Sequence, residues 1–88
     1  MSKLKVMYFS APWCGPCKMF KPAFNEVVEK FDDIDVEQIN VDENQDLSKE
    51  HAIRSIPAVV MLKDDEEVFR NVGVMSKSEL KSKIEKYK

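Results

Sequence analysis

The sequence is poor in the residues that bind structural metals. Its 88 residues include two cysteines and one histidine, His51. Tetrahedral zinc in proteins takes four ligands, which usually come from two Cys or His pairs. His51 is the only candidate for a third ligand, and the sequence holds no fourth Cys or His. We therefore predict no metal site; a zinc cluster shared between two chains is the one metal arrangement left open.

Long apolar stretches and clusters of one charge are also missing. No apolar segment approaches the roughly 20 residues that a membrane-spanning helix needs. The 14 basic and 16 acidic residues are interspersed and give a net charge of -2, which argues against nucleic acid as a partner. The first residues lead directly into an apolar segment, without the cleavage site of a signal peptide. We predict a cytoplasmic protein that binds neither membranes nor nucleic acid, in a compartment where thiols are normally reduced.

The length and the spacing of apolar residues predict a single α/β domain over residues 1–88. Apolar runs predict strands over residues 4–9, 35–41, 58–62 and 67–72. Helical spacing predicts a long helix from the cysteines to about residue 31, kinked at Pro22. A short helix is expected between residues 42 and 51, and a last one after the capping-box pair Ser76 and Glu79. The order β-α-β-α-β-β-α predicts a four-stranded mixed sheet with helices on both faces.

Both cysteines lie in the segment Trp13-Cys14-Gly15-Pro16-Cys17, between the first predicted strand and the first predicted helix. A disulfide between them encloses too short a loop to stabilise the fold much, so reactivity is the better explanation of the pair. Cys14 stands at the helix start, where free N–H groups and the helix dipole favour a thiolate, the nucleophile of disulfide exchange. We expect Cys14, with a lowered pKa, to attack first. Cys17, one turn further and more buried, is expected to resolve the mixed disulfide.

This segment resembles the active site of the thioredoxin family, and the resemblance extends along nearly the whole chain. Pro22 is similar to the family's helix-kinking proline. The segment Arg54-Ser55-Ile56-Pro57 resembles the family loop that ends in a cis-proline opposite the cysteines. Val72-Gly73 resembles the glycine loop that lines the substrate groove. Together these motifs are far more specific than two cysteines at this spacing.

The resemblance implies a thioredoxin fold and a protein dithiol–disulfide oxidoreductase that acts on disulfide-containing proteins. It also implies a monomer without a cofactor, recharged by thioredoxin reductase or an equivalent. Met75, next to the glycine loop, is expected to be partly exposed and to touch substrates. The residues expected to support substrate binding beside Cys14 and Cys17 are Trp13, which shields the sulfur, and Gly15, Pro16, Ile56, Pro57 and Gly73.

Three positions differ from the family pattern. The chain begins at what corresponds to the family's second strand. The buried aspartate that the family places beneath the cysteines corresponds to Tyr8, and its accompanying lysine corresponds to Gln38. A tyrosine with an ordinary pKa of about 10 is a poor base at neutral pH. We therefore expect Cys17 to keep a high pKa, with Tyr8 donating a hydrogen bond to a sulfur or binding a water.

Two other functions remain open at the level of sequence. The first is a glutaredoxin-like, glutathione-dependent reductase, which fits the chain length, although the cysteine motif and the Ile56-Pro57 loop lack the usual glutathione-binding features. The second is a thioredoxin-fold binding subunit whose cysteines are incidental. The presence of both cysteines together with Trp13 and Pro57 argues against the second function.

Overall fold

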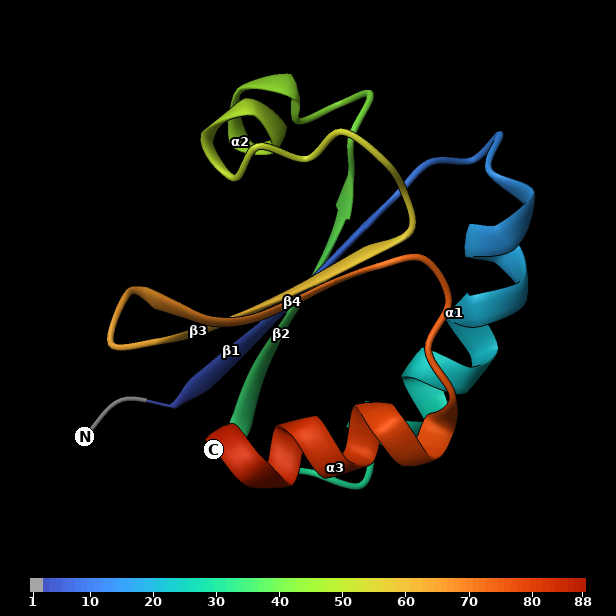
Figure 1. Cartoon of the computed structure of the whole chain (residues 1–88). Coiled ribbons are helices and arrows are strands. Elements are labelled where there is room, and N and C mark those ends of the chain that lie inside the picture. Colours follow the sequence, from blue (N-terminus) through green and yellow to red (C-terminus); the bar gives the residue numbers. More distant parts are fainter. Residues whose placement is uncertain (1–2) are drawn as a thin grey trace.

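Four strands and three helices follow one another in the predicted order β-α-β-α-β-β-α. The computed structural model describes residues 3–88 (Figure 1). Its elements are β1 (Leu4–Ser10), α1 (Gly15–Val28), β2 (Ile34–Asn40), α2 (Gln45–Glu50), β3 (Ala58–Lys63), β4 (Glu66–Val72) and α3 (Lys77–Tyr87).

The strands form one mixed sheet in the order β2-β1-β3-β4. β1 runs parallel to β2, with Tyr8 opposite Gln38, and antiparallel to β3, with Tyr8 opposite Val59. β3 and β4 form an antiparallel hairpin. The predicted four-stranded mixed sheet is therefore confirmed. β1 is an internal strand of this sheet. The segment with both cysteines follows β1 and therefore lies at the end of the sheet's central strands.

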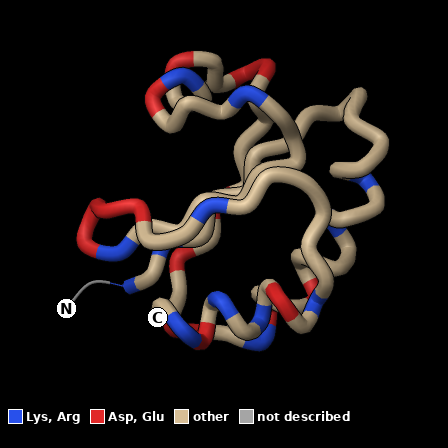
Figure 2. Tube along the Cα trace, viewed as in Figure 1, with Lys and Arg blue, Asp and Glu red and all other residues tan. Residues whose placement is uncertain are grey.

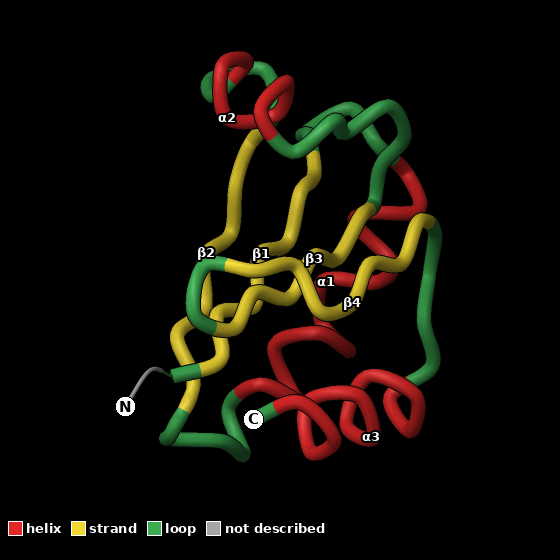
Figure 3. The backbone as a smooth tube through the Cα atoms, turned by 60° about the vertical axis from the view of Figure 1, so that its left-hand side comes forward, coloured by secondary structure: helices red, strands yellow, loops and turns green. Residues whose placement is uncertain are grey.

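Helices cover both faces of the sheet, as predicted (Figure 3). α1 and α3 pack on one face and α2 lies against the other, near one end. The strand residues under α1 and α3 are the alternate residues Leu4, Val6 and Tyr8 of β1 with Val59 and Met61 of β3. The opposite set, Met7, Phe9 and Val60 with Ala58, packs against Leu47 of α2.

Two helix boundaries differ from the sequence prediction. α1 ends at Val28, before residue 31, although Phe31 still packs against the core. α2 begins at Gln45 because the preceding residues form a turn that Asn40 organises. The Asn40 side chain accepts a hydrogen bond of 2.9 Å from the Asp42 N–H, and its carbonyl accepts one of 3.1 Å from the Asn44 N–H.

The β3–β4 turn consists of Asp64 and Asp65, which both have positive φ angles, of 54° and 66°. Two residues of this kind match a hairpin turn whose twist suits the flanking strands, and aspartate tolerates the left-handed region better than most residues. The turn is therefore acidic, and Glu66, which follows it, is the first residue of β4. Acidic residues gather at this hairpin tip, whereas α3 carries both charges (Figure 2).

The capping prediction for α3 is confirmed in part. The Ser76 hydroxyl accepts a hydrogen bond of 3.1 Å from the Glu79 N–H. The Glu79 carboxylate bonds the same hydroxyl, also at 3.1 Å, rather than the Ser76 backbone. Within residues 3–88, none of the helices combines the length and apolar character needed to cross a membrane.

Candidate active site

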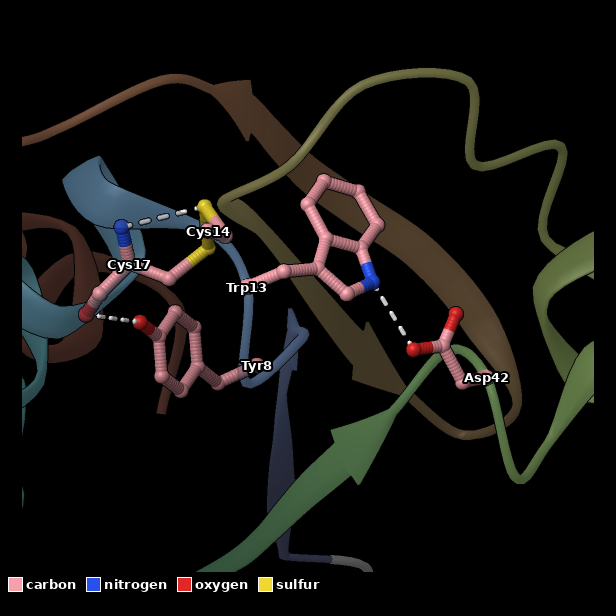
Figure 4. Close-up of a disulfide and its surroundings, with 5 residues drawn as sticks. All are labelled: Tyr8, Trp13, Cys14, Cys17 and Asp42. Atoms are coloured by element: carbon pink, nitrogen blue, oxygen red, sulfur yellow. Dashed lines mark hydrogen bonds between the residues drawn. A yellow bond between two sulfur atoms is a disulfide. The ribbon is translucent and has the colours of Figure 1, made fainter.

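The two cysteines form a disulfide at the start of α1 (Figure 4). Cys14 is the N-cap residue of the helix, and Pro16 occupies one of its first positions, where a missing N–H costs nothing. Cys14 is 5% exposed and Cys17 is 3% exposed. Cys17 is thus the more buried of the two, as expected, but by a small margin in the oxidised state.

A backbone hydrogen bond points at the Cys14 sulfur. The Cys17 N–H donates to Cys14 Sγ over 3.2 Å, which is the capping interaction of α1. No acidic residue lies in the first helical turn. A negative charge on this sulfur is therefore favoured by a donor aimed at it, by the helix dipole and by the absence of a competing carboxylate in that turn.

Tyr8 lies beneath the cysteines, as the resemblance to the thioredoxin family implied. Its side chain is fully buried, stacks on Phe24 at 4.7 Å and meets Phe20 edge-on at 5.5 Å between ring centroids. Its hydroxyl donates a hydrogen bond of 2.9 Å to the Cys17 carbonyl oxygen (Figure 4), not to a sulfur. Burial raises the pKa of this hydroxyl above its ordinary value. Tyr8 therefore stays neutral near pH 7.

The loop before β3 reaches the cysteines from a distant part of the sequence. Its Ile56–Pro57 peptide bond is cis. Ile56 packs against the small apolar cluster of Ala11, Cys14 and Cys17. The Pro57 carbonyl accepts a hydrogen bond of 2.8 Å from the Gly73 N–H. The structure thus links the predicted site residues to one another, because Pro57 ties the glycine loop to the loop that touches the disulfide.

Trp13 has a partner that the sequence did not indicate. The indole is 68% exposed, and its N–H donates to an Asp42 carboxylate oxygen at 2.8 Å (Figure 4). Asp42 follows β2, so the two residues come from neighbouring strand ends. The only sequence signal for Asp42 was its place after a strand parallel to the one that precedes the cysteines, at the same edge of the sheet.

The exposed apolar residues around the glycine loop differ from those expected. Met75 is 4% exposed and packs in the core with α1 and α3, so the expectation of a partly exposed Met75 is wrong. Its neighbour Val74 is exposed instead, as is Val72. Gly73, between the two valines, has a φ angle of +99°, and this conformation turns the chain after β4.

The cysteine pair is the reactive feature of the described chain. Within residues 3–88, no group of three or more His, Cys, Asp or Glu side chains is arranged to hold a metal ion. The pair stands on a helix end beside a central strand, with the sulfur of its first residue facing a backbone donor. Fold and site together define a small dithiol–disulfide exchange protein.

Comparisons with known proteins identify the family. The thioredoxin family model matches residues 1–86. Thioredoxin H2 of Arabidopsis thaliana is 41% identical over 85 residues, which cover 97% of this chain and 63% of that protein. Thioredoxin of Ophiophagus hannah is 42% identical over 86 residues, which cover 98% of this chain and 81% of that protein. This chain thus spans just under two thirds of the first relative and more of the second.

Solved structures agree with these relatives. The crystal structure of thioredoxin NaTrxh from Nicotiana alata superposes with a TM-score of 0.93 at 42% identity, covering 100% of this chain and 76% of that one. A mutant thioredoxin from Halobacterium salinarum gives a TM-score of 0.90 at 37% identity, covering 98% and 75%. The chain belongs to the thioredoxin family, whose members are thiol–disulfide oxidoreductases.

Proposed function

We propose that this chain reduces disulfide bonds in proteins, with Cys14 as the nucleophile and Cys17 as the resolving residue. One observation carries these roles. The Cys17 N–H, at the start of α1, is aimed at the sulfur of Cys14 over 3.2 Å. This donor stabilises negative charge on Cys14, whereas Cys17 lies one turn inside the helix. Membership of the thioredoxin family supports the reaction class.

The proposed reaction transfers two electrons from the protein dithiol to the substrate disulfide. The Cys14 thiolate attacks one substrate sulfur and expels the other as a thiolate, which leaves a mixed disulfide. The Cys17 thiolate then attacks Cys14 Sγ, forming the Cys14–Cys17 bond and releasing the second substrate sulfur. Substrate disulfide is the oxidant, and the protein ends with its two cysteines joined as a disulfide.

The proposed substrate surface surrounds the disulfide. An extended substrate segment would pair with the backbone of Ile56, next to Pro57 and Gly73. The exposed side chains of Val72 and Val74 offer apolar contact beside it. Trp13, which its hydrogen bond holds toward Asp42, would border this substrate surface. Gly15 and Pro16 would let the substrate approach the sulfur of Cys14.

The cellular setting belongs to the same proposal. We expect a single domain that works as a monomer in the cytoplasm, without a cofactor of its own, and that is recharged by thioredoxin reductase or an equivalent. The family assignment supports a reductase as electron donor. Supplying oxidised protein with either thioredoxin reductase and NADPH or with glutathione separates this donor from the glutathione-dependent alternative.

The test compares Cys17→Ser with Cys14→Ser. Each reduced variant is mixed with a disulfide-containing protein, and covalent complexes are counted by mass spectrometry under non-reducing conditions. Cys17→Ser is expected to accumulate mixed disulfides because the attack proceeds and the release does not. Cys14→Ser is expected to capture little. Equal trapping by the two variants, or no reduction of the substrate by the unmodified chain, would contradict the proposal.

A further inference from the structure

A cavity of about 460 Å³ lies beside Cys17. It is bounded by the end of β1, the segment after it, the first turns of α1 and the end of β2. The lining residues that bear on the chemistry of Cys17 are Tyr8, Lys18, Lys21, Gln38 and Asn40. Lys18 and Lys21 are exposed, so the cavity is open to solvent on the side of α1.

The charges that face this cavity are of one sign. α1 contributes Lys18 and Lys21, and β2 contributes the neutral amides of Gln38 and Asn40. β1 contributes Tyr8, whose hydroxyl is neutral and bonded to the Cys17 carbonyl. Within residues 3–88, the lining includes no carboxylate.

Two acidic residues follow β2, and neither is among the residues that line the cavity. Asp42 accepts from the Trp13 indole at 2.8 Å. Glu43 accepts from the Asn40 amide at 3.5 Å. The charged side chains that line the cavity itself are therefore the two lysines, and a positive charge near a thiol favours its thiolate.

This inference rests on the proposed function and deepens it. We propose that the cavity is where Cys17 exchanges its proton with water, and that Lys18 and Lys21 favour the Cys17 thiolate that resolves the mixed disulfide. They act as positioning charges and do not touch the reacting atoms. Both lysines lie on α1, so the positive charge at the cavity comes from α1. The family resemblance instead places a lysine at the position of Gln38 on β2.

The resolving step conserves protons and electrons. The Cys17 thiol loses its proton to a water in the cavity. The resulting thiolate attacks Cys14 Sγ, the bond between Cys14 and the substrate sulfur breaks, and the Cys14–Cys17 bond forms. The substrate sulfur leaves as a thiolate and takes its proton from solvent. The lysines change only the pH at which the first event occurs.

The test uses Cys14→Ser, in which Cys17 is the sole thiol. The rate of alkylation by iodoacetamide is measured against pH, and its midpoint reports the thiolate of Cys17. Adding Lys21→Gln is expected to raise the midpoint by about 0.4 pH unit, the order of magnitude that Coulomb's law gives for one water-screened charge near a titrating group. Lys18→Gln is expected to act in the same direction. Lys81→Gln, which removes an exposed charge from α3, is the matched control and is expected to leave the midpoint unchanged.

A second pair of variants reverses the sign at one position. Gln38→Lys and Gln38→Glu place opposite charges at a position whose side chain now donates a 2.7 Å hydrogen bond to Asn25. The lysine variant is expected to lower the midpoint and the glutamate variant to raise it. In about 1 M salt, where the Debye length is roughly 3 Å, all of these differences are expected to shrink.

Shifts of these signs, absent from Lys81→Gln, would support the proposal. Midpoints that do not move, or that move equally with Lys81→Gln, would overturn it. The readout does not depend on substrate reduction. If the shifts appear while the unmodified chain fails to reduce protein disulfides, the proposed function is wrong and the charge effect stands.

Discussion

The Tyr8 hydroxyl donates a hydrogen bond of 2.9 Å to the Cys17 carbonyl, which links the central strand to the helix that carries the disulfide. The bond is fully buried, and no buried side-chain polar atom in residues 3–88 lacks a partner. The family's carboxylate position is therefore occupied here by a group that holds the helix in place. It does so without taking up a proton near pH 7.

We expect Tyr8→Phe to lower the free energy of unfolding by about 1 kcal/mol, because the ring stays packed and one buried hydrogen bond is lost. Tyr8→Asp is expected to cost more, since it leaves a cavity between Phe20 and Phe24 and buries a carboxylate. Urea denaturation of the oxidised proteins at pH 7 measures both. Equal stability of the two variants would show that the site is wet enough to solvate a carboxylate.

The reactivity of Cys14 gives a prediction about pH. In Cys17→Ser, where Cys14 is the sole thiol, we expect the midpoint of alkylation to lie below the value of about 8.5 typical of a free cysteine. The reason is the N–H at position 17, which points at the sulfur from the helix end. Alkylation rates measured from acid to alkaline pH test this. A midpoint at or above that of a cysteine-containing peptide would remove the physical basis for Cys14 as nucleophile.

The two glycines of the chain are expected to respond differently to alanine. A Cβ at either position meets nothing within 4 Å, so the backbone alone decides. Gly73 has a φ of +99°, and Gly73→Ala is expected to cost about 1–2 kcal/mol of stability. Gly15, the first residue of α1, is expected to accept alanine without loss. Paired urea titrations decide this, and an unaffected Gly73→Ala would show that the loop after β4 adjusts freely.

The Glu67–Arg70 pair on β4 predicts a small dependence of stability on pH. Its guanidinium bonds the carboxylate at 2.7 and 3.0 Å and the His51 carbonyl at 2.5 Å. The hydrogen bond from Arg70 lowers the pKa of Glu67. A lowered carboxyl pKa gives stability that is present above the unfolded-state pKa and is lost as pH falls through the folded-state value.

We therefore expect Glu67→Gln to cost a few tenths of a kcal/mol at pH 7, because the pair is partly exposed and solvent-screened. The cost is expected to vanish once the pH is low enough to protonate the folded-state carboxyl. Glu66→Gln, one residue earlier on the same strand, is the control. It is expected to leave the free energy of unfolding unchanged both at pH 7 and at the low pH. If both glutamines behave alike, the pairing with Arg70 contributes nothing measurable.

Local patterns in the sequence were sufficient for most of the fold. The apolar run before the cysteines is β1, the Ser76 cap starts α3, and two aspartates form the β3–β4 turn. These features depend on neighbours a few residues away, so single-sequence chemistry reveals them. The end of α1 depends instead on where the chain must turn into β2, and the prediction placed it about three residues late.

Long-range contacts could not be predicted in this way. Asp42 contacts Trp13 across 29 residues, and its place after a strand parallel to β1 is too general a signal to predict that contact. Met75 is drawn into the core because the segment after Gly73 crosses toward α1 and α3. Lys21 has a helix position that indicates a solvent-facing residue, and only the packing of α1 beside β2 places it at the cavity next to Cys17.

The two edge strands of the sheet affect how copies of this chain associate in solution. Within residues 3–88, β2 and β4 are the outer strands, and such strands are templates for pairing with another chain. β2 carries Asp35 and Glu37, β4 begins with two glutamates, and the β3–β4 register shifts between Met61 and Leu62. Charge repulsion and an irregular strand both discourage fibre-like stacking. The sequence pI is about 5.4, so the net charge that helps to keep copies apart approaches zero near that pH, and protection against self-association weakens there.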